Sequence, residues 1–170
     1  AKKAKPEKAH DIGVRPLAGV QTHITARGSE PKAHVELQFS APDKYTANGE
    51  RDVGILSDVL SIRLREVLRE DMGGVYGVGA WGWHSRRPIG ERGFQISFGC
   101  DPARVDELKA AVFTVVKEVQ TSGASDDNLA KARASRKRSM ETDLRDNGYW
   151  LRKLAQAFSY GDDPRDIGKL

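Results

Sequence analysis

Residues 68–76 read Leu-Arg-Glu-Asp-Met-Gly-Gly-Val-Tyr, and this stretch sets the order of the elements on either side of it. Upstream, apolar residues recur three and four positions apart, which is the spacing of one helix face. Downstream, a glycine-rich stretch leads to the next turn. Gly73 and Gly74 lie at this change of pattern, and adjacent glycines are typical of a turn that ends a helix. The sequence therefore predicts a long helix over 49–71 and a strand over 75–84.

The helix predicted over 49–71 carries an apolar stripe along most of its length. Asn48 precedes the helix and is a candidate N-cap, because its side chain can accept a hydrogen bond from an amide of the first turn. The stripe consists of Val53, Leu56, Val59, Leu60, Leu64, Val67 and Leu68. A stripe of this kind is the face that a helix buries in a protein core.

Alternation of apolar and polar residues predicts three further strands, over 19–27, 34–39 and 94–100. The last is the clearest, because its apolar residues occupy every second position: Phe94, Ile96, Phe98 and Cys100. We expect this strand to pair antiparallel with 75–84. We also expect the side chains of Phe94, Ile96 and Phe98 to be buried beneath the long helices.

Three helices are predicted after the last strand. Residues 101–102 are Asp-Pro, a typical N-cap followed by proline at the first helical position. Gly123 is expected to end this helix and Ser125 to cap the next, while residues 147–148, Asn-Gly, predict a break before a short last helix. Strands that come in adjacent pairs favour antiparallel pairing. The predicted fold class is therefore α+β, an antiparallel sheet with helices packed on one face.

The composition is that of a globular domain. The chain has 170 residues, of which 38% are apolar and 31% charged, and no apolar run approaches the roughly 18 residues of a membrane span. The net charge is +4, and four lysines fall within the first eight positions. We interpret 1–14 as a basic flexible linker and 15–170 as the domain. Because the domain itself is close to neutral, the overall charge gives little support to nucleic-acid binding.

The sequence predicts no metal site and no disulfide in this chain. Cys100 is the single cysteine, which excludes an internal disulfide and a multi-cysteine metal cluster. We interpret it as a small buried residue at a strand end; a catalytic thiol is the alternative, but no base lies near it in sequence. The four histidines form neither H-E-x-x-H nor H-x-x-E-H. Catalytic zinc needs three protein ligands and an open position.

Two other motifs have functional interpretations that their context weakens. Residues 77–82 match G-x-G-x-x-G, but no helix start follows, and a dinucleotide site requires one. The run Lys131–Arg138 is the densest basic stretch and could bind nucleic acid. Several acidic residues flank it and no aromatic residue interleaves it, so a solvated helix face is the favoured interpretation.

Arg69 and Tyr76 are the candidate site residues. The first falls in the last turn of the predicted helix and the second at the start of the strand, so the two-glycine turn can bring both toward one point. Together a guanidinium and a phenol could hold a peptide carbonyl and donate to an oxyanion. The alternative is that Arg69 complements the helix dipole and Tyr76 packs on the sheet. Residue types alone favour this alternative.

The segment 69–76 resembles the arginine-to-tyrosine motif in the non-catalytic domain of insulinase-type (pitrilysin-type) zinc metallopeptidases. Three other stretches resemble the same domain: Arg-Leu-Arg-Glu-Val-Leu at 63–68, Ile-Ser-Phe-Gly-Cys-Asp-Pro at 96–102 and Asn-Gly-Tyr-Trp-Leu at 147–151. The likeness runs from about Gly13 to the end of the chain and is nearest to bacterial members.

The resemblance implies the substrate-binding, non-catalytic half of a zinc metalloendopeptidase that hydrolyses peptides. The catalytic residues and the zinc would then belong to a partner domain carrying H-x-x-E-H, and this chain alone would be inactive. Arg69 and Tyr76 would hold the peptide substrate and support the oxyanion. The family pattern continues past the equivalent of Leu170, so the domain is expected to be truncated at its C-terminal end.

Two other functions remain open at this stage. A structural subunit of the same fold, without peptidase activity, is one; a nucleic-acid-binding module that uses Lys131–Arg138 is the other. The resemblance suggests a bacterial periplasm or cell envelope, but the sequence determines neither the compartment nor the peptide substrate. It also leaves the oligomeric state undetermined.

Overall fold

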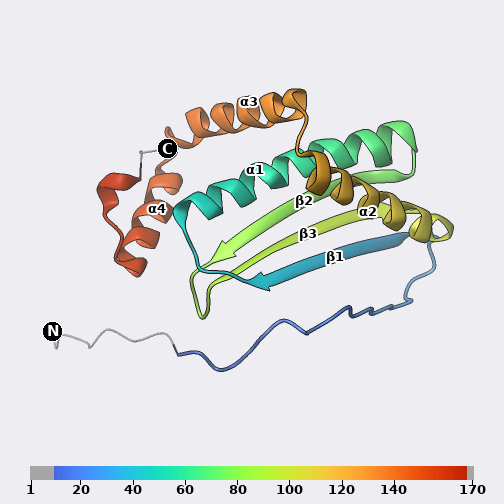
Figure 1. Ribbon diagram of the computed structural model, residues 1–170, viewed down its shortest axis with the longest axis horizontal. Coiled ribbons are helices and arrows are strands. Elements are labelled where there is room, and N and C mark those ends of the chain that lie inside the picture. The colour runs from blue at the N-terminus through green and yellow to red at the C-terminus, as the bar shows by residue number, and fades with distance from the viewer. Residues whose placement is uncertain (1–9, 168–170) are drawn as a thin grey trace. The chain divides into compact units, whose positions relative to one another are not determined.

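The computed structural model describes residues 10–167, so most of the linker predicted over 1–14 lies outside the described residues. The chain separates into two compact units, one ending at Leu129 and the other beginning at Ala130. The first unit contains the whole sheet and two of the long helices (Figure 1).

The sheet has three strands, β1 (Ala33–Pro42), β2 (Val75–Ser85) and β3 (Glu91–Cys100). Its order is β1-β3-β2, and both pairings are antiparallel. The last strand in sequence is therefore the central one. In register, Val35 faces Phe98 across one pairing and Ala80 faces Ile96 across the other. The predicted antiparallel pairing of 75–84 with 94–100 is confirmed.

Helices α1 (Ala47–Leu64) and α2 (Val105–Ser122) cover one face of this sheet (Figure 1). The core lies between them and includes Leu60, Leu64 and Leu68 from the first helical stretch, Leu108, Val112 and Val115 from α2, and Ile96, Phe98 and Cys100 from β3. Ile96 and Phe98 are each only 1% exposed, while Phe94 packs against the cluster half-buried. The predicted fold class and the predicted buried face of β3 are confirmed.

The second unit is helical. Helix α3 (Asp126–Asp143) begins in the first unit and continues into the second, where α4 (Asn147–Tyr160) and a short 3₁₀ turn, η3 (Pro164–Asp166), follow. Within this unit the Trp150 indole donates to the Leu144 carbonyl at 3.0 Å, which fixes the turn between the two helices.

One predicted strand is absent. Residues 19–27 are extended but have no strand partner among the described residues, and the apolar side chains of Val20 and Ile24 are 96% and 85% exposed. Alternation indicates a strand only where a neighbouring edge supplies backbone hydrogen bonds. The free edge of β1 does not supply them here, so the prediction of a strand over 19–27 was wrong.

Two predicted helix starts are also corrected. Thr46, not Asn48, caps α1, because its Oγ1 accepts from the Gly49 amide at 2.9 Å. Residues 147–148 form the first turn of α4 instead of breaking a helix, and Asp146 caps that turn through the amides of both Gly148 and Tyr149. The predicted cap by Asp101 is confirmed, with a 3₁₀ turn, η2 (Pro102–Arg104), leading into α2.

Candidate functional site

The junction between the first long helix and β2 begins with a change of helix type. After Leu64 the chain continues as a π-helix, η1 (Arg65–Asp71), and the Met72 amide donates to the carbonyl of Val67, five residues back, at 3.0 Å. A π-helix is wider than an α-helix and is frequent at functional sites. The predicted helix therefore reaches residue 71, but its last seven residues, which include Arg69, have a different geometry.

The two glycines that follow are held in place from outside the turn. Gly73 has a φ of +57°, which favours glycine, and the Gly74 amide donates to the Leu68 carbonyl at 2.9 Å. A Cβ on Gly74 would lie 2.6 Å from Cδ2 of Leu108 in α2. Arg104 donates to the Met72 carbonyl at 3.3 Å. The turn is thus clamped against the start of α2.

Tyr76 lies in a β-bulge at the start of β2. Val75 is opposite Cys100 and Gly77 is opposite Gly99, so Tyr76 is the extra residue between them. A bulge of this kind redirects a side chain. The Tyr76 ring passes 3.8 Å from the position of a Cβ on Gly99, and Gly99 alternates with the core residues Phe98 and Cys100. Tyr76 therefore lies on the face of the sheet away from α1 and α2, and it is 74% exposed.

Arg69 is also exposed, on the last turns of η1. In the part of the chain that the structure describes, no hydrogen bond or ion pair joins the Arg69 guanidinium or the Tyr76 hydroxyl to another residue. Both groups therefore keep their donors available on either side of a rigid turn. The convergence of the two side chains on one shared cavity stays a prediction.

Two surface hollows lie elsewhere. One, of about 550 Å³, is lined by Lys44, Tyr45, Thr46, Ala47, Arg86 and Gly90 at the start of α1. The other, of about 480 Å³, lies beside the connection from α2 to α3, where Arg63, Glu118 and Asn128 are among its walls. Neither is lined by Arg69 or Tyr76.

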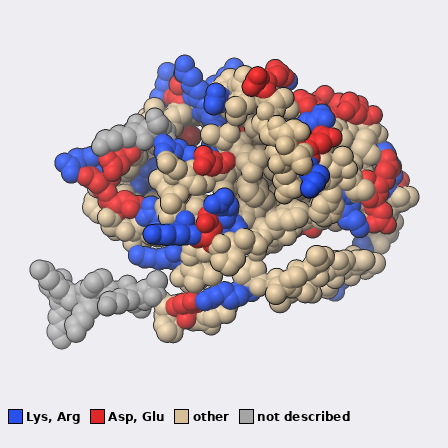
Figure 2. Space-filling view, viewed as in Figure 1, with Lys and Arg blue, Asp and Glu red and all other residues tan. Residues whose placement is uncertain are grey.

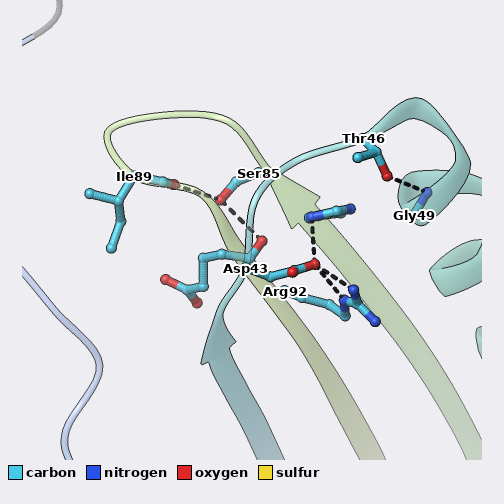
Figure 3. Close-up of polar contacts among 8 residues, drawn as sticks. Asp43, Thr46, Gly49, Ser85, Ile89 and Arg92 are labelled. Atoms are coloured by element: carbon cyan, nitrogen blue, oxygen red, sulfur yellow. Dashed lines mark hydrogen bonds and ion pairs between the residues drawn. The ribbon is translucent and has the colours of Figure 1, made fainter.

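A polar cluster at the other end of β2 was not expected from the sequence (Figure 3). Asp43, in the connection from β1 to α1, accepts hydrogen bonds from the Arg92 guanidinium, and its Oδ2 lies 3.0 Å from Nε2 of the fully buried His84 side chain. The Arg92 guanidinium, more than any other group, lowers the pKa of the Asp43 carboxyl. Residues 43, 84 and 92 follow no spacing rule, so only their pairing in three dimensions identifies them.

The cluster positions the start of α1 on the sheet. A Cβ on Gly49 would lie 2.7 Å from both Nδ1 and Cε1 of His84, so the first turn of the helix packs directly on the imidazole. Thr46 caps the same turn, as Figure 3 shows. The arrangement joins β1, α1, β2 and β3 at one point, and we assign it a structural role.

The other sequence motifs occupy structural positions. Residues 77–82 lie inside β2, so the G-x-G-x-x-G pattern has no helix N-terminus for a pyrophosphate. Cys100 is buried in the core, and burial raises the pKa of its thiol, so the thiol is neutral at physiological pH. Within residues 10–167 no three histidine, cysteine or acidic side chains are grouped so as to hold a metal ion.

The basic run Lys131–Arg138 lies on α3, where all of its side chains except Ala132 are exposed. Figure 2 shows basic and acidic side chains next to one another over much of the face drawn. Across the described residues, no helix combines the length and the hydropathy of a membrane-crossing segment.

Comparison with known proteins gives consistent matches. A family model described as the peptidase M16 inactive domain matches residues 2–136. The probable zinc protease PqqL of Haemophilus influenzae is 31% identical over 111 residues, which make up 65% of this chain and 12% of that protein.

Two solved structures share the fold. The periplasmic protease PqqL from Escherichia coli gives a TM-score of 0.62 at 22% identity, and a mutant of the ferredoxin protease FusC, in complex with Arabidopsis ferredoxin, gives 0.65 at 21%. Each alignment covers 79% of this chain and 15% of the other chain. This chain thus spans between 12% and 15% of the length of these relatives.

Proposed function

Because this chain belongs to the family of the peptidase M16 inactive domain, we propose that it is a non-catalytic, substrate-binding domain of a zinc-dependent metalloendopeptidase that hydrolyses peptides. Its relatives include bacterial zinc proteases, and the chain itself is of the inactive type. The proposal gives it a positioning and electrostatic role toward a peptide that another domain cleaves.

The zinc ion of such an enzyme does not fit this chain. Catalytic zinc takes three protein ligands, and no group of three candidate ligands is present among residues 10–167. We therefore place the metal in a partner domain of the catalytic type, which carries H-x-x-E-H. Every step assigned to this chain concerns only how the peptide is held.

Arg69 and Tyr76 are the residues that we assign to the peptide. The planar guanidinium of Arg69 offers a fork of donors to a backbone carbonyl and fixes the substrate in place. The Tyr76 phenol offers one hydroxyl proton to the carbonyl oxygen that becomes negatively charged during hydrolysis. A donor aimed at that oxygen stabilises the transition state more than the ground state.

The observation that carries the proposal is the irregular junction between Arg69 and Tyr76, two exposed groups whose polar atoms bond to no other side chain within residues 10–167. A π-helix, a clamped two-glycine turn and a β-bulge follow one another within residues 65–77. π-Helical turns are frequent at functional sites, and β-bulges are over-represented next to active sites. Their succession around the two-glycine turn supports a functional role for this junction.

The test uses the assembled enzyme, with the catalytic-type domain present. We expect Tyr76→Phe to lower kcat by about 10²–10³, the usual effect of losing one oxyanion donor, with little change in KM or in thermal stability. Arg69→Lys keeps the charge but loses the planar fork, so it should raise KM as well as lower kcat.

Tyr45→Phe is the matched control. It removes the same hydroxyl from a tyrosine just before the start of α1, at the opposite end of that helix from the junction. Its kcat should equal that of the wild type. If Tyr76→Phe leaves kcat within about twofold of the wild type, far below the effect of one lost donor, the catalytic role is wrong. If both variants assemble normally and neither Tyr76→Phe nor Arg69→Lys changes kcat or KM, the chain is a structural subunit.

A further inference from the structure

The open face of the sheet carries two tryptophans on the same strand as Tyr76. Trp81 and Trp83 flank Gly82, and a Cβ on Gly82 would lie 2.5 Å from Cγ1 of Val53 in α1. Because successive residues of a strand point to opposite faces, both tryptophans point away from α1. They share the open face with Tyr76.

The two rings have different surroundings. A Cβ on Gly93 would lie 2.2 Å from Cζ2 of Trp83, so the Trp83 ring covers the backbone of β3 at that point. Its indole nitrogen also donates to Glu91 at 3.4 Å. The Trp81 side chain is 45% exposed. The Trp83 ring therefore forms part of the surface of the sheet, and the Trp81 ring beside it is accessible to a ligand.

The part of β2 and β3 that joins Trp81 to Tyr76 carries no charged side chain of its own. Gly79 pairs with Ser97, and Trp81 pairs with Gln95, so the neighbouring positions of β3 are small or neutral. The Glu36 carboxylate of β1 accepts a hydrogen bond from Gln95 and lies one strand further from Trp81. A Cβ on Gly77 or Gly79 would meet no atom within 4 Å, which leaves the backbone of β2 open to contact. A neutral, aromatic strip favours an apolar side chain over a phosphate or a charged group.

We propose that Trp81 forms a subsite for a large apolar side chain of the peptide, and this inference rests on the proposed function of Arg69 and Tyr76. Five strand positions separate Tyr76 from Trp81, or about 16 Å at roughly 3.3 Å per residue. An extended peptide covers this distance in about five residues. The side chain that Trp81 binds therefore lies about five residues from the bond that is cleaved at Tyr76.

The first experiment detects binding in this chain alone, without catalysis. The indole N–H signals of Trp81, Trp83 and Trp150 are followed by ¹⁵N NMR while a ten-residue peptide is added. Two peptides are compared, identical except for Phe or Ala at one central position. We expect a saturable shift of the Trp81 signal with the Phe peptide and a much weaker one with the Ala peptide. Trp150, on α4, is the internal control and should not shift.

Each other outcome overturns the subsite. An equal response to both peptides removes the apolar specificity, and an equal response of Trp81 and Trp150 shows non-specific contact. A Trp81 signal that moves with protein concentration in the absence of peptide assigns the face to a second copy of the chain.

The second experiment uses the assembled enzyme and separates this inference from the proposed function. We expect kcat/KM to favour Phe over Ala by about tenfold at the fifth residue from the cleaved bond, and Trp81→Ala to abolish that preference. Tyr76→Phe should slow the cleavage of both peptides and keep the preference. A preference that survives in Trp81→Ala overturns the subsite; an unaffected rate in Tyr76→Phe overturns the proposed function.

Discussion

Gly74 shows how a single missing side chain holds the candidate site together. Its position has no room for a Cβ, because Leu108 and Arg104 would lie 2.6 and 3.0 Å from it. Gly73, its neighbour, is needed for a different reason, since its φ of +57° disfavours any side chain whatever the space. Gly73 is needed for the backbone conformation, and Gly74 is needed for the packing of α2 on the turn.

We predict that Gly74→Ala lowers the free energy of unfolding by about 1–3 kcal/mol, because the added methyl group overpacks the contact with Leu108. Gly79→Ala is the control, in the strand β2 that follows the turn, where a Cβ would meet nothing within 4 Å. It should change the free energy by no more than about 0.5 kcal/mol. Urea unfolding of both variants is the measurement, and equal stabilities would contradict the clamp described for this turn.

Residues were predictable from the sequence where a local pattern or a motif marked them. Asp101 as a cap and the glycines of the turn follow from local chemistry, and Arg69 and Tyr76 were selected from a motif only eight residues long. The Asp43, His84 and Arg92 cluster was not found, because Asp43 is distant in sequence from the β2–β3 hairpin on which His84 and Arg92 pair. Their proximity depends on strand register, which no single position shows.

At the scale of elements, the helix types could not be predicted although their extent could. Leu64 and Leu68 are buried in the observed structure, and a spacing of four residues suits the apolar stripe of either an α-helix or a π-helix. The sequence pattern therefore predicts that a helix reaches residue 71 but does not predict that it widens after Leu64. The prediction of a strand over 19–27 was wrong for the opposite reason. The alternating pattern is clear, but no neighbouring strand pairs with this segment among residues 10–167.

The polar cluster that joins four elements predicts a dependence of stability on pH. The pKa of Asp43 is lowered below its ordinary value of 3.8 in the folded state, above all by the Arg92 guanidinium. A lowered pKa contributes stability that is fully present above the ordinary value and is lost as the pH falls through the folded pKa. We expect part of the acid destabilisation below about pH 4 to come from this carboxylate.

Asp43→Asn removes the titrating group. Its unfolding free energy should therefore depend less steeply on pH than that of the wild type between about pH 4 and pH 2. Asp52→Asn is the control, because Asp52 is an exposed carboxylate within α1. Unfolding by urea at a series of pH values measures the slopes. A wild-type slope in Asp43→Asn would show that the ion pair does not contribute in the folded state.

At the scale of the whole molecule, the fold class followed from the sequence because the helices and β3 have strong periodicity. What the sequence did not show is the boundary near Leu129, which falls inside the continuous helix α3. A helix that belongs to two units has no glycine or proline to mark the boundary. The assignment of residues 15–170 to one domain stays a prediction.

The exposed segment that precedes β1 gives a prediction about the whole fold. Val20 and Ile24 lie in solvent, so replacing both by serine should change the unfolding free energy by no more than about 0.5 kcal/mol. Val35→Ser, at a half-buried position of β1, should lower it by roughly 1–2 kcal/mol. A loss of stability in the double variant similar to that of Val35→Ser would show that the segment packs on the sheet in solution.

The strand order β1-β3-β2 has a consequence for the time course of synthesis. β1 and β2 have no backbone hydrogen bonds to each other, and each pairs only with β3, which is the last of the three to leave the ribosome. Until residue 100 has emerged, β1 and β2 have no partner strand to pair with. Sheet formation is then a single late event that closes loops of up to 66 residues between Ala33 and Cys100 at once. A chaperone that holds nascent chains would encounter this protein in that interval.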